Sequence, residues 1–263
     1  DYGYSVAVDS SGNVYTTGVF QGTVDFDPGA GTANLTSNGS YDVFVSKLDS
    51  SGNYVWAKNL GGTDRDFGYS VAVDSSGNVY TTGYFQGTAD FNPDPATTAN
   101  LTATLPGLQD IFVSKLDSSG EYVWAKMLDG PTGGIGYSVA VDSSGNVYTT
   151  GWFYGTVDFD PDPLETADLT SIGDSDVFVS KLDSSGNYLW AKNLGGTSPD
   201  KSYSVAVDSS GNVYTTGWFY GTVDFDPDPL ETANLTSNGA QDVFVSKLDS
   251  SGNYLWAKNL GGT

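Results

Sequence analysis

The stretch Tyr-Ser-Val-Ala-Val-Asp-Ser-Ser-Gly-Asn-Val-Tyr-Thr-Thr-Gly at residues 4–18 decides the fold. The same letters return from Tyr69, Tyr137 and Tyr203. A second stretch, Phe-Val-Ser-Lys-Leu-Asp-Ser-Ser-Gly, also occurs four times, beginning at Phe44, Phe112, Phe178 and Phe244. The chain is therefore four copies of one unit of about 66 residues, and a repeat of this length indicates a modular architecture.

Each copy contains four segments that are typical of β-strands. In the first copy they are residues 4–8, 14–20, 43–48 and 54–60, all rich in β-branched and aromatic side chains. Asp-Ser-Ser-Gly-Asn separates the first two segments and again the last two, and Glu121 replaces the Asn in one of these eight connections. Asp at the first position of a turn, followed by a left-handed Gly, predicts a hairpin. Insertions occur only between the second and third segments, which indicates a surface excursion there.

Composition excludes several classes of protein. The 10 basic and 32 acidic residues give a net charge of −22, which argues against binding to nucleic acid or to an anionic membrane. The sequence has no Cys and no His, so it cannot form disulfides, zinc–thiolate sites or a Ser-His-Asp triad. Aromatic residues make up 14% and charged residues 16% of the chain, which excludes intrinsic disorder.

Radial repetition of four-stranded sheets is the β-propeller, which is found with about 4 to 8 blades. We therefore predict an all-β fold: a ring of four four-stranded antiparallel blades that together form a single β-propeller domain over residues 1–263. The blades should span roughly residues 1–63, 64–130, 131–197 and 198–263. The outer-strand tryptophans should lie in the core, and they are Trp56, Trp124, Trp190 and Trp256.

The repeated strings also resemble a known family. Residues 7–15, 42–52 and 60–63 together look like the bacterial SBBP family of β-propeller repeats, and the first string is also similar to NHL propeller repeats. The resemblance covers all four copies. It implies a propeller in secreted or surface-attached bacterial proteins, usually without known catalysis. The family name refers to seven blades, whereas this chain carries four.

The excursion in each copy contains a cluster of Asp residues alternating with Phe and Pro, as in Asp158-Phe159-Asp160-Pro161-Asp162. Residues two apart in an extended chain point to the same side, and clustered carboxylates are hard-oxygen ligands suited to Ca²⁺. The predicted metal ligands are Asp25, Asp27, Asp90, Asp94, Asp158, Asp160, Asp162, Asp224, Asp226 and Asp228. The alternative is an Asp-Pro turn with solvated carboxylates. Either a bound Ca²⁺ or a short extra strand pair around residues 33–37 would order the excursion.

Four nearly identical units give four equivalent environments, whereas an active site normally needs unlike roles for its acid and base. We therefore expect no enzymatic activity. The sameness of the copies favours an acidic scaffold that acts in assembly, adhesion or a filament, and the family resemblance implies that it is extracellular, secreted or at the cell surface of a bacterium. Its partners would be further copies of the chain or neighbouring propeller units.

The alternative is a glycan-binding module, in which exposed aromatic side chains stack on sugar rings. The candidates for such stacking are Trp152, Tyr154, Trp218 and Tyr220. Three further positions match the N-glycosylation acceptor pattern, and they begin at Asn34, Asn100 and Asn234. In a bacterial protein, the favoured interpretation of these positions is that they are polar strand residues.

Overall fold

The computed structural model describes residues 1–262, and every helix-or-strand element in that range is a β-strand. The chain divides into two compact units, Asp1–Met127 and Leu128–Thr263. Each unit holds two blades. Within residues 1–262 no helix has the length and apolar character needed to cross a membrane.

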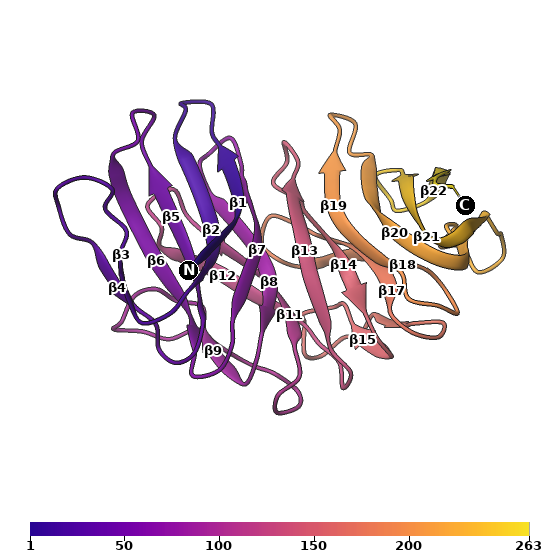
Figure 1. Cartoon of the computed structure of the whole chain (residues 1–263), viewed down its shortest axis with the longest axis horizontal. Coiled ribbons are helices and arrows are strands. Elements are labelled where there is room, and N and C mark those ends of the chain that lie inside the picture. Colours follow the sequence, from indigo (N-terminus) through magenta and orange to yellow (C-terminus); the bar gives the residue numbers. More distant parts are fainter. Residues whose placement is uncertain (263) are drawn as a thin grey trace. The chain divides into compact units, whose positions relative to one another are not determined.

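Unit 1 consists of two antiparallel four-stranded blades, each with its strands in chain order (Figure 1). The first blade contains β1 (Tyr2–Val8), β2 (Val14–Phe20), β5 (Asp42–Leu48) and β6 (Tyr54–Gly62). The second contains β7 (Phe67–Val73), β8 (Val79–Phe85), β11 (Asp110–Leu116) and β12 (Tyr122–Leu128). The four predicted segments of the first copy match β1, β2, β5 and β6 to within two residues, which confirms the strand assignment.

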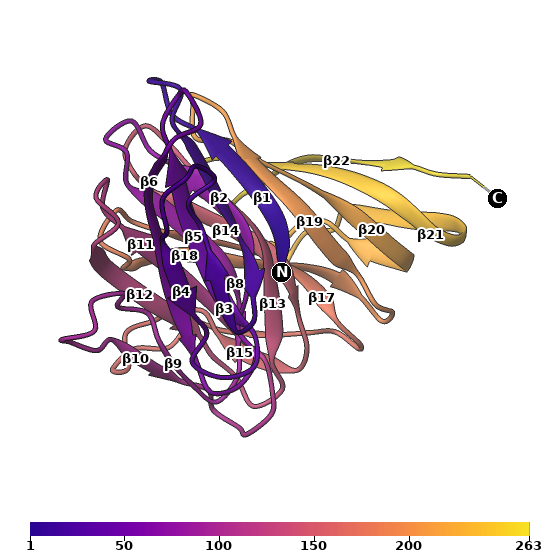
Figure 2. The same cartoon turned by 60° about the vertical axis from the view of Figure 1, so that its left-hand side comes forward.

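Unit 2 repeats this plan. The third blade contains β13 (Gly134–Val141), β14 (Val147–Phe153), β17 (Asp176–Leu182) and β18 (Tyr188–Gly196). The fourth contains β19 (Lys201–Val207), β20 (Val213–Asp224), β21 (Asn234–Leu248) and β22 (Tyr254–Leu260). Figure 2 shows β20 and β21 as the long central pair of this blade. They are long because both strands continue into the excursion, with one register shift between Tyr220 and Thr222.

The excursions are ordered by short strand pairs. In the first three copies these pairs are β3 (Thr23–Asp25) with β4 (Asn34–Thr36), β9 (Thr88–Asp90) with β10 (Asn100–Thr102), and β15 (Thr156–Asp158) with β16 (Asp168–Thr170). The extra strand pair predicted around residues 33–37 is therefore confirmed. In unit 1, β6 also pairs with β9 of the following blade through Gly61 and Gly62, and in unit 2 β18 pairs with β20 in the same way.

The Asp-Ser-Ser-Gly connections form the predicted turns. In the first one, Gly12 has a φ of 80° and its N–H donates to the Asp9 carbonyl at 3.0 Å. The Asp9 carboxylate accepts hydrogen bonds from the backbone of Ser11 and Asn13, from the Asn13 side chain and from the Tyr15 hydroxyl. The Asn13 side chain lowers the pKa of Asp9 to about 2. These carboxylates are turn-forming groups, since their oxygens are occupied within the turn.

Each unit has a hydrophobic core between its two blades. In unit 1, Tyr15, Val43 and Leu60 of the first blade meet Val71 and Phe112 of the second. Unit 2 has the equivalent core. Trp56, Trp124 and Trp190 are buried as predicted, whereas Trp256 on the last blade is partly exposed. All four predicted blades are present, and closure of the two units into one ring stays a prediction.

Candidate functional site

The Asp-rich excursions form a ladder of hydrogen-bonded turns, most fully developed in the third copy. Asp158 Oδ1 accepts the N–H groups of Asp160 at 2.9 Å and Ala167 at 2.8 Å. Asp160 Oδ1 accepts the N–H of Asp162 at 2.9 Å, and Asp162 Oδ1 accepts that of Leu164 at 3.0 Å. Each carboxylate therefore fixes the backbone two residues further on, an Asx turn.

The other copies use the same pattern. Asp25, Asp90 and Asp224 each accept one N–H group two residues on and a second from a later Ala. Asp27, Asp94, Asp226 and Asp228 accept the N–H two residues on. The hydrogen bond from Ala33 contributes most to lowering the pKa of Asp25.

The predicted calcium site finds no support in this arrangement. Over residues 1–262 no three or more Asp or Glu side chains are grouped so that they could hold a metal ion. One oxygen of each predicted ligand is engaged by backbone N–H groups. Within each excursion the predicted ligands lie close together in the chain, as the sequence indicated. Their carboxylates form a ladder of hydrogen-bonded turns rather than a shell of metal ligands. Calcium binding stays a prediction.

A different set of carboxyl groups is buried where one blade passes into the next. In unit 1, Asp42 and Asp66 are both fully buried. Asp66 accepts the N–H groups of Gly62 at 2.6 Å and Gln86 at 3.3 Å, while Asp42 Oδ2 accepts that of Asn38 at 2.7 Å. Burial raises the pKa of Asp42 and raises that of Asp66 to about 7, to which the negative charge of Asp42 adds.

Unit 2 contains the same pair as Asp176 and Asp200. Asp200 accepts the N–H groups of Gly196 and Tyr220, both at 3.0 Å. Burial raises the pKa of Asp200 to about 7 and that of Asp176 to about 6. Asp176 and Asp200 are fully buried, so they cannot reach a bound substrate. Asp200 ties the third blade to the fourth, because Gly196 lies on β18 and Tyr220 on β20, whereas Asp176 accepts hydrogen bonds within the third copy from Ile172 and Asn193.

Sequence reasoning missed these four residues. A weak signal was present, because an Asp stands at the start of the third strand of every copy. Another Asp stands three residues before the repeated Tyr in three copies, and Gly134 replaces it in the third copy. An Asp before a strand usually indicates a solvated turn, so its burial is visible only in the folded unit.

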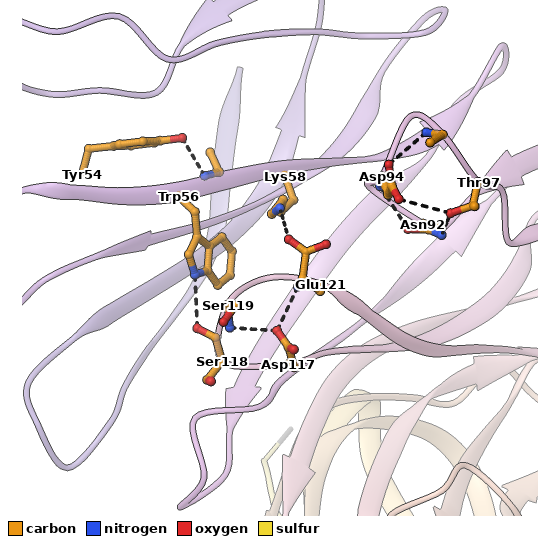
Figure 3. Close-up of polar contacts among 12 residues, drawn as sticks. Tyr54, Trp56, Lys58, Asn92, Asp94, Thr97, Asp117, Ser118, Ser119 and Glu121 are labelled. Carbon is orange, nitrogen blue, oxygen red and sulfur yellow. Dashed lines mark hydrogen bonds and ion pairs between the residues drawn. The ribbon is translucent and has the colours of Figure 1, made fainter.

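A polar clasp joins β5 and β6 of the first blade to the turn between β11 and β12 of the second blade in unit 1 (Figure 3). Trp56 Nε1 donates to the Ser118 carbonyl at 3.3 Å, and Lys47 Nζ donates to the same oxygen at 3.2 Å. Figure 3 also shows Lys58 meeting Glu121, at 3.1 Å. In unit 2, Trp190 and Lys181 donate to the Ser250 carbonyl at 3.2 and 3.1 Å. The same clasp therefore recurs at both junctions.

Unit 2 also has an open polar cleft of about 440 Å³ next to this clasp. It is lined by Lys192 of the third blade and by residues of the fourth, among them Asp226, Asp228, Glu231 and Tyr254. Two of the predicted metal ligands thus face a lysine across the cleft. A cleft with an ammonium, several carboxylates and a phenol ring suits a polyhydroxylated ligand better than a bare cation.

The aromatic residues predicted to stack on sugars differ in exposure. Tyr154 and Tyr220 are 45% and 44% exposed. The Trp152 ring is covered by Lys201, whose Nζ lies 4.4 Å from the ring centre, and Trp218 Nε1 donates to the Tyr203 hydroxyl at 3.1 Å. The two tyrosines are therefore more accessible than the two tryptophans.

The strand order, the eight turns and the repeated clasp define a β-propeller repeat protein. The family model for the SBBP β-propeller repeat matches four segments, residues 1–19, 55–90, 124–152 and 189–218. The matches fall in all four copies and confirm the resemblance to the SBBP β-propeller repeat that the repeated strings indicated.

Two curated relatives and two solved structures are similar to this chain. An uncharacterized WD repeat-containing protein of Acanthamoeba polyphaga mimivirus is 28% identical over 99% of the chain, and the regulatory protein FlaEY of Caulobacter vibrioides is 27% identical over 90%. The chain spans only 22% of the length of each relative. A Bacteroides caccae protein of unknown function covers 93% of this chain and 94% of its own, with 12% identity and a TM-score of 0.26. Sqt1 of Chaetomium thermophilum covers 97% and 83%, with 12% identity and a TM-score of 0.33.

Proposed function

We propose that this chain is a non-enzymatic extracellular scaffold that acts through assembly with further blades of its own kind, as part of a surface adhesin or filament. The observation that carries the proposal is the recurrence of the same side chains in the same contacts. Both units use one core pattern, one Trp–Lys clasp and one buried carboxyl pair.

Three features support a structural rather than a catalytic role. The carboxyl groups with raised pKa values are fully buried, so no substrate can contact them. The exposed carboxylates of the excursions hold backbone N–H groups in turns. The four copies also repeat the same residue types at the same positions, whereas acid–base catalysis requires two groups that play unlike roles.

Light scattering over a wide range of protein concentration tests the assembly. The measurement should be made at about 0.15 M salt, where the Debye length is about 8 Å and repulsion between the acidic chains is screened. We expect the mass to rise with concentration and negative-stain images to show linear or ring-shaped particles. A particle that stays monomeric at the highest concentration would contradict the assembly role.

The extracellular location rests on the family resemblance and needs its own test. Protease treatment of intact cells that express the parent protein should remove these repeats if they lie at the surface. Repeats that remain intact until the cells are lysed would place the protein inside the cell.

Glycan binding is the second candidate function, and the polar cleft of unit 2 favours it. Its carboxylates accept hydroxyl hydrogens and Lys192 donates to ring or hydroxyl oxygens, a combination that suits a polyol. Glu231→Ala in the cleft and Trp218→Ala outside it form a matched pair for glycan-array binding. Loss with the first variant alone would identify the cleft, loss with the second would identify the aromatic surface, and no wild-type binding would remove this candidate.

A further inference from the structure

The buried carboxyl pairs at the blade junctions include oxygens that no hydrogen bond satisfies. In unit 1, Asp42 is fully buried, and its Oδ2 accepts the N–H of Asn38 at 2.7 Å. The Asn59 side chain also donates to this carboxylate. Over residues 1–262, however, nothing donates to Asp42 Oδ1 or to Asn59 Oδ1, and both atoms are buried. A buried acceptor without a donor is costly, so two such atoms on side chains in contact point to a ligand.

Unit 2 repeats these two unpaired oxygens. Asp176 is fully buried, and its Oδ2 accepts the N–H of Ile172 and the side-chain amide of Asn193, both at 2.9 Å. Oδ1 of Asp176 and Oδ1 of Asn193 are buried and accept no hydrogen bond from the described residues. The same two atoms are thus unpaired in both units, so the feature belongs to the junction and not to one irregular loop.

A second carboxyl group lies beside the first in each unit. A Cβ built on Gly61 would lie 2.8 Å from Asp42 Cγ and also 2.8 Å from Asp66 Oδ2, so both carboxyls approach this glycine. Burial raises the pKa of Asp66 and the charge of Asp42 adds to the rise, as burial and the charge of Asp176 do for Asp200. None of these four carboxyls forms an ion pair with a lysine or arginine in the part of the chain that the structure describes. Two buried acids and an amide oxygen therefore share each junction without a cation of the protein to balance them.

The amide and the second carboxyl occur together in the sequence. Asn59 of the first copy is followed by Asp66, and the third copy repeats both residues. After the second copy, Met127 and Gly134 stand at the corresponding positions, so the two groups are absent together. An Asn that served only its own blade would not need to change with an Asp at the start of the next. Their joint replacement fits two groups that hold one ligand.

We propose that each unit binds one Ca²⁺ ion at its blade junction. In unit 1 the ligands are Asp42 Oδ1, Asn59 Oδ1 and the Asp66 carboxylate, and in unit 2 they are the counterparts Asp176, Asn193 and Asp200. Carboxylate and amide oxygens are ligands that Ca²⁺ prefers, and its flexible coordination suits groups from different elements. The ion pairs with the unsatisfied oxygens, balances two buried charges and links one blade to the next. Without the ion, protons take its place on the buried carboxyls.

This site is separate from the calcium site predicted in the excursions, because it uses none of those ten residues. Equilibrium dialysis of the full chain, stripped with EDTA, against Ca²⁺ up to about 1 mM and elemental analysis count the bound ions. We expect two ions per chain. Asn59→Met, which introduces the residue found at Met127, should reduce the count to one, and its combination with Asn193→Met should reduce it to none. Asp160→Asn in an excursion is the matched control and should keep both ions.

Asn59→Asp provides a second test that does not depend on losing a ligand. The added carboxylate should tighten Ca²⁺ binding in unit 1 and should lower the melting temperature in EDTA, because three buried carboxyls then repel one another. A purely structural Asn would give the lower melting temperature without the tighter binding. Circular dichroism in EDTA checks that each variant is folded.

Three results would overturn the proposal. The first is a double Met variant that still binds two ions. The second is a count that falls in Asp160→Asn instead, which would place the ion in the excursion. The third is a wild-type chain that binds no Ca²⁺, which would show that water satisfies the unpaired oxygens. The scaffold role stands or falls on the assembly measurements and is unaffected by any of these results.

Discussion

The stability of both units should fall as the pH rises from about 5 to about 8, because burial raises the pKa of Asp66 and of Asp200 to about 7. In the unfolded chain these carboxyls return to an ordinary value near 3.8. Between the two values the folded protein holds protons that the unfolded chain has lost. The resulting stabilisation is complete below the ordinary pKa and is lost as the pH passes through the raised one.

The size of the effect follows from the shift. One pKa unit corresponds to about 1.4 kcal/mol. From pH 8 to pH 5, Asp66 becomes protonated in the folded state but stays ionised in the unfolded one, so each such carboxyl should add about 2 to 3 kcal/mol to the free energy of unfolding. Asp9, a turn carboxylate, does not oppose this pH dependence. Its pKa is about 2, so it titrates below the range from pH 5 to pH 8.

Urea unfolding followed by tryptophan fluorescence at several pH values measures the effect, and Asp66→Asn isolates it. The variant cannot ionise, so the transition of unit 1 should lose most of its pH dependence. At pH 5 it should also be less stable by about 1 to 3 kcal/mol, because the amide places a donor opposite the N–H of Gly62 or Gln86. Asp162→Asn, at an exposed turn, is the control and should keep the wild-type profile. A wild-type protein equally stable at both pH values, or an Asp66→Asn protein with an unchanged profile, would refute this reasoning.

Three further predictions concern the junctions, turns and excursions. Gly62→Ala should destabilise unit 1 by about 1 to 3 kcal/mol, because the new Cβ would clash with the Thr88 backbone carbonyl. Gly262→Ala is the control: a Cβ there has nothing within 4 Å, so the melting temperature should stay unchanged. Asp74→Ala should lower the free energy of unfolding in urea by about 1 to 3 kcal/mol, because it removes the acceptor for two backbone N–H groups, the Asn78 side-chain amide and the Tyr80 hydroxyl. An unchanged urea midpoint would show that water replaces the carboxylate as their hydrogen-bond acceptor. If the excursions bind Ca²⁺ as the sequence predicts, Ca²⁺ should raise the melting temperature and EDTA should lower it. A melting temperature that thorough chelation leaves unchanged would show that the turn ladder orders the excursions without an ion.

Much of the local structure followed from the sequence because its causes are local. The left-handed Gly and the Asp carboxylate of each Asp-Ser-Ser-Gly turn act within five residues, so eight hairpins could be predicted from their letters. The β-branched and aromatic residues indicated the strands, and the length of the excursion called for either a bound Ca²⁺ or an extra strand pair, of which the structure shows the strand pair. The Asp ladder was recognised as a cluster, but its role depended on where nearby N–H groups point, which residue spacing does not specify.

What the sequence by itself determined is therefore the blade: its four strands, its turns and its repetition. Only the tertiary structure decided the environment of each copy. Val6 and Val71 stand in identical local sequences, yet one is 63% and the other 5% exposed. Asp66 looks like a turn residue and is instead buried beside Asp42. The reason is that burial and pKa depend on the neighbouring blade, which is distant in sequence and differs between the ends and the middle of the chain.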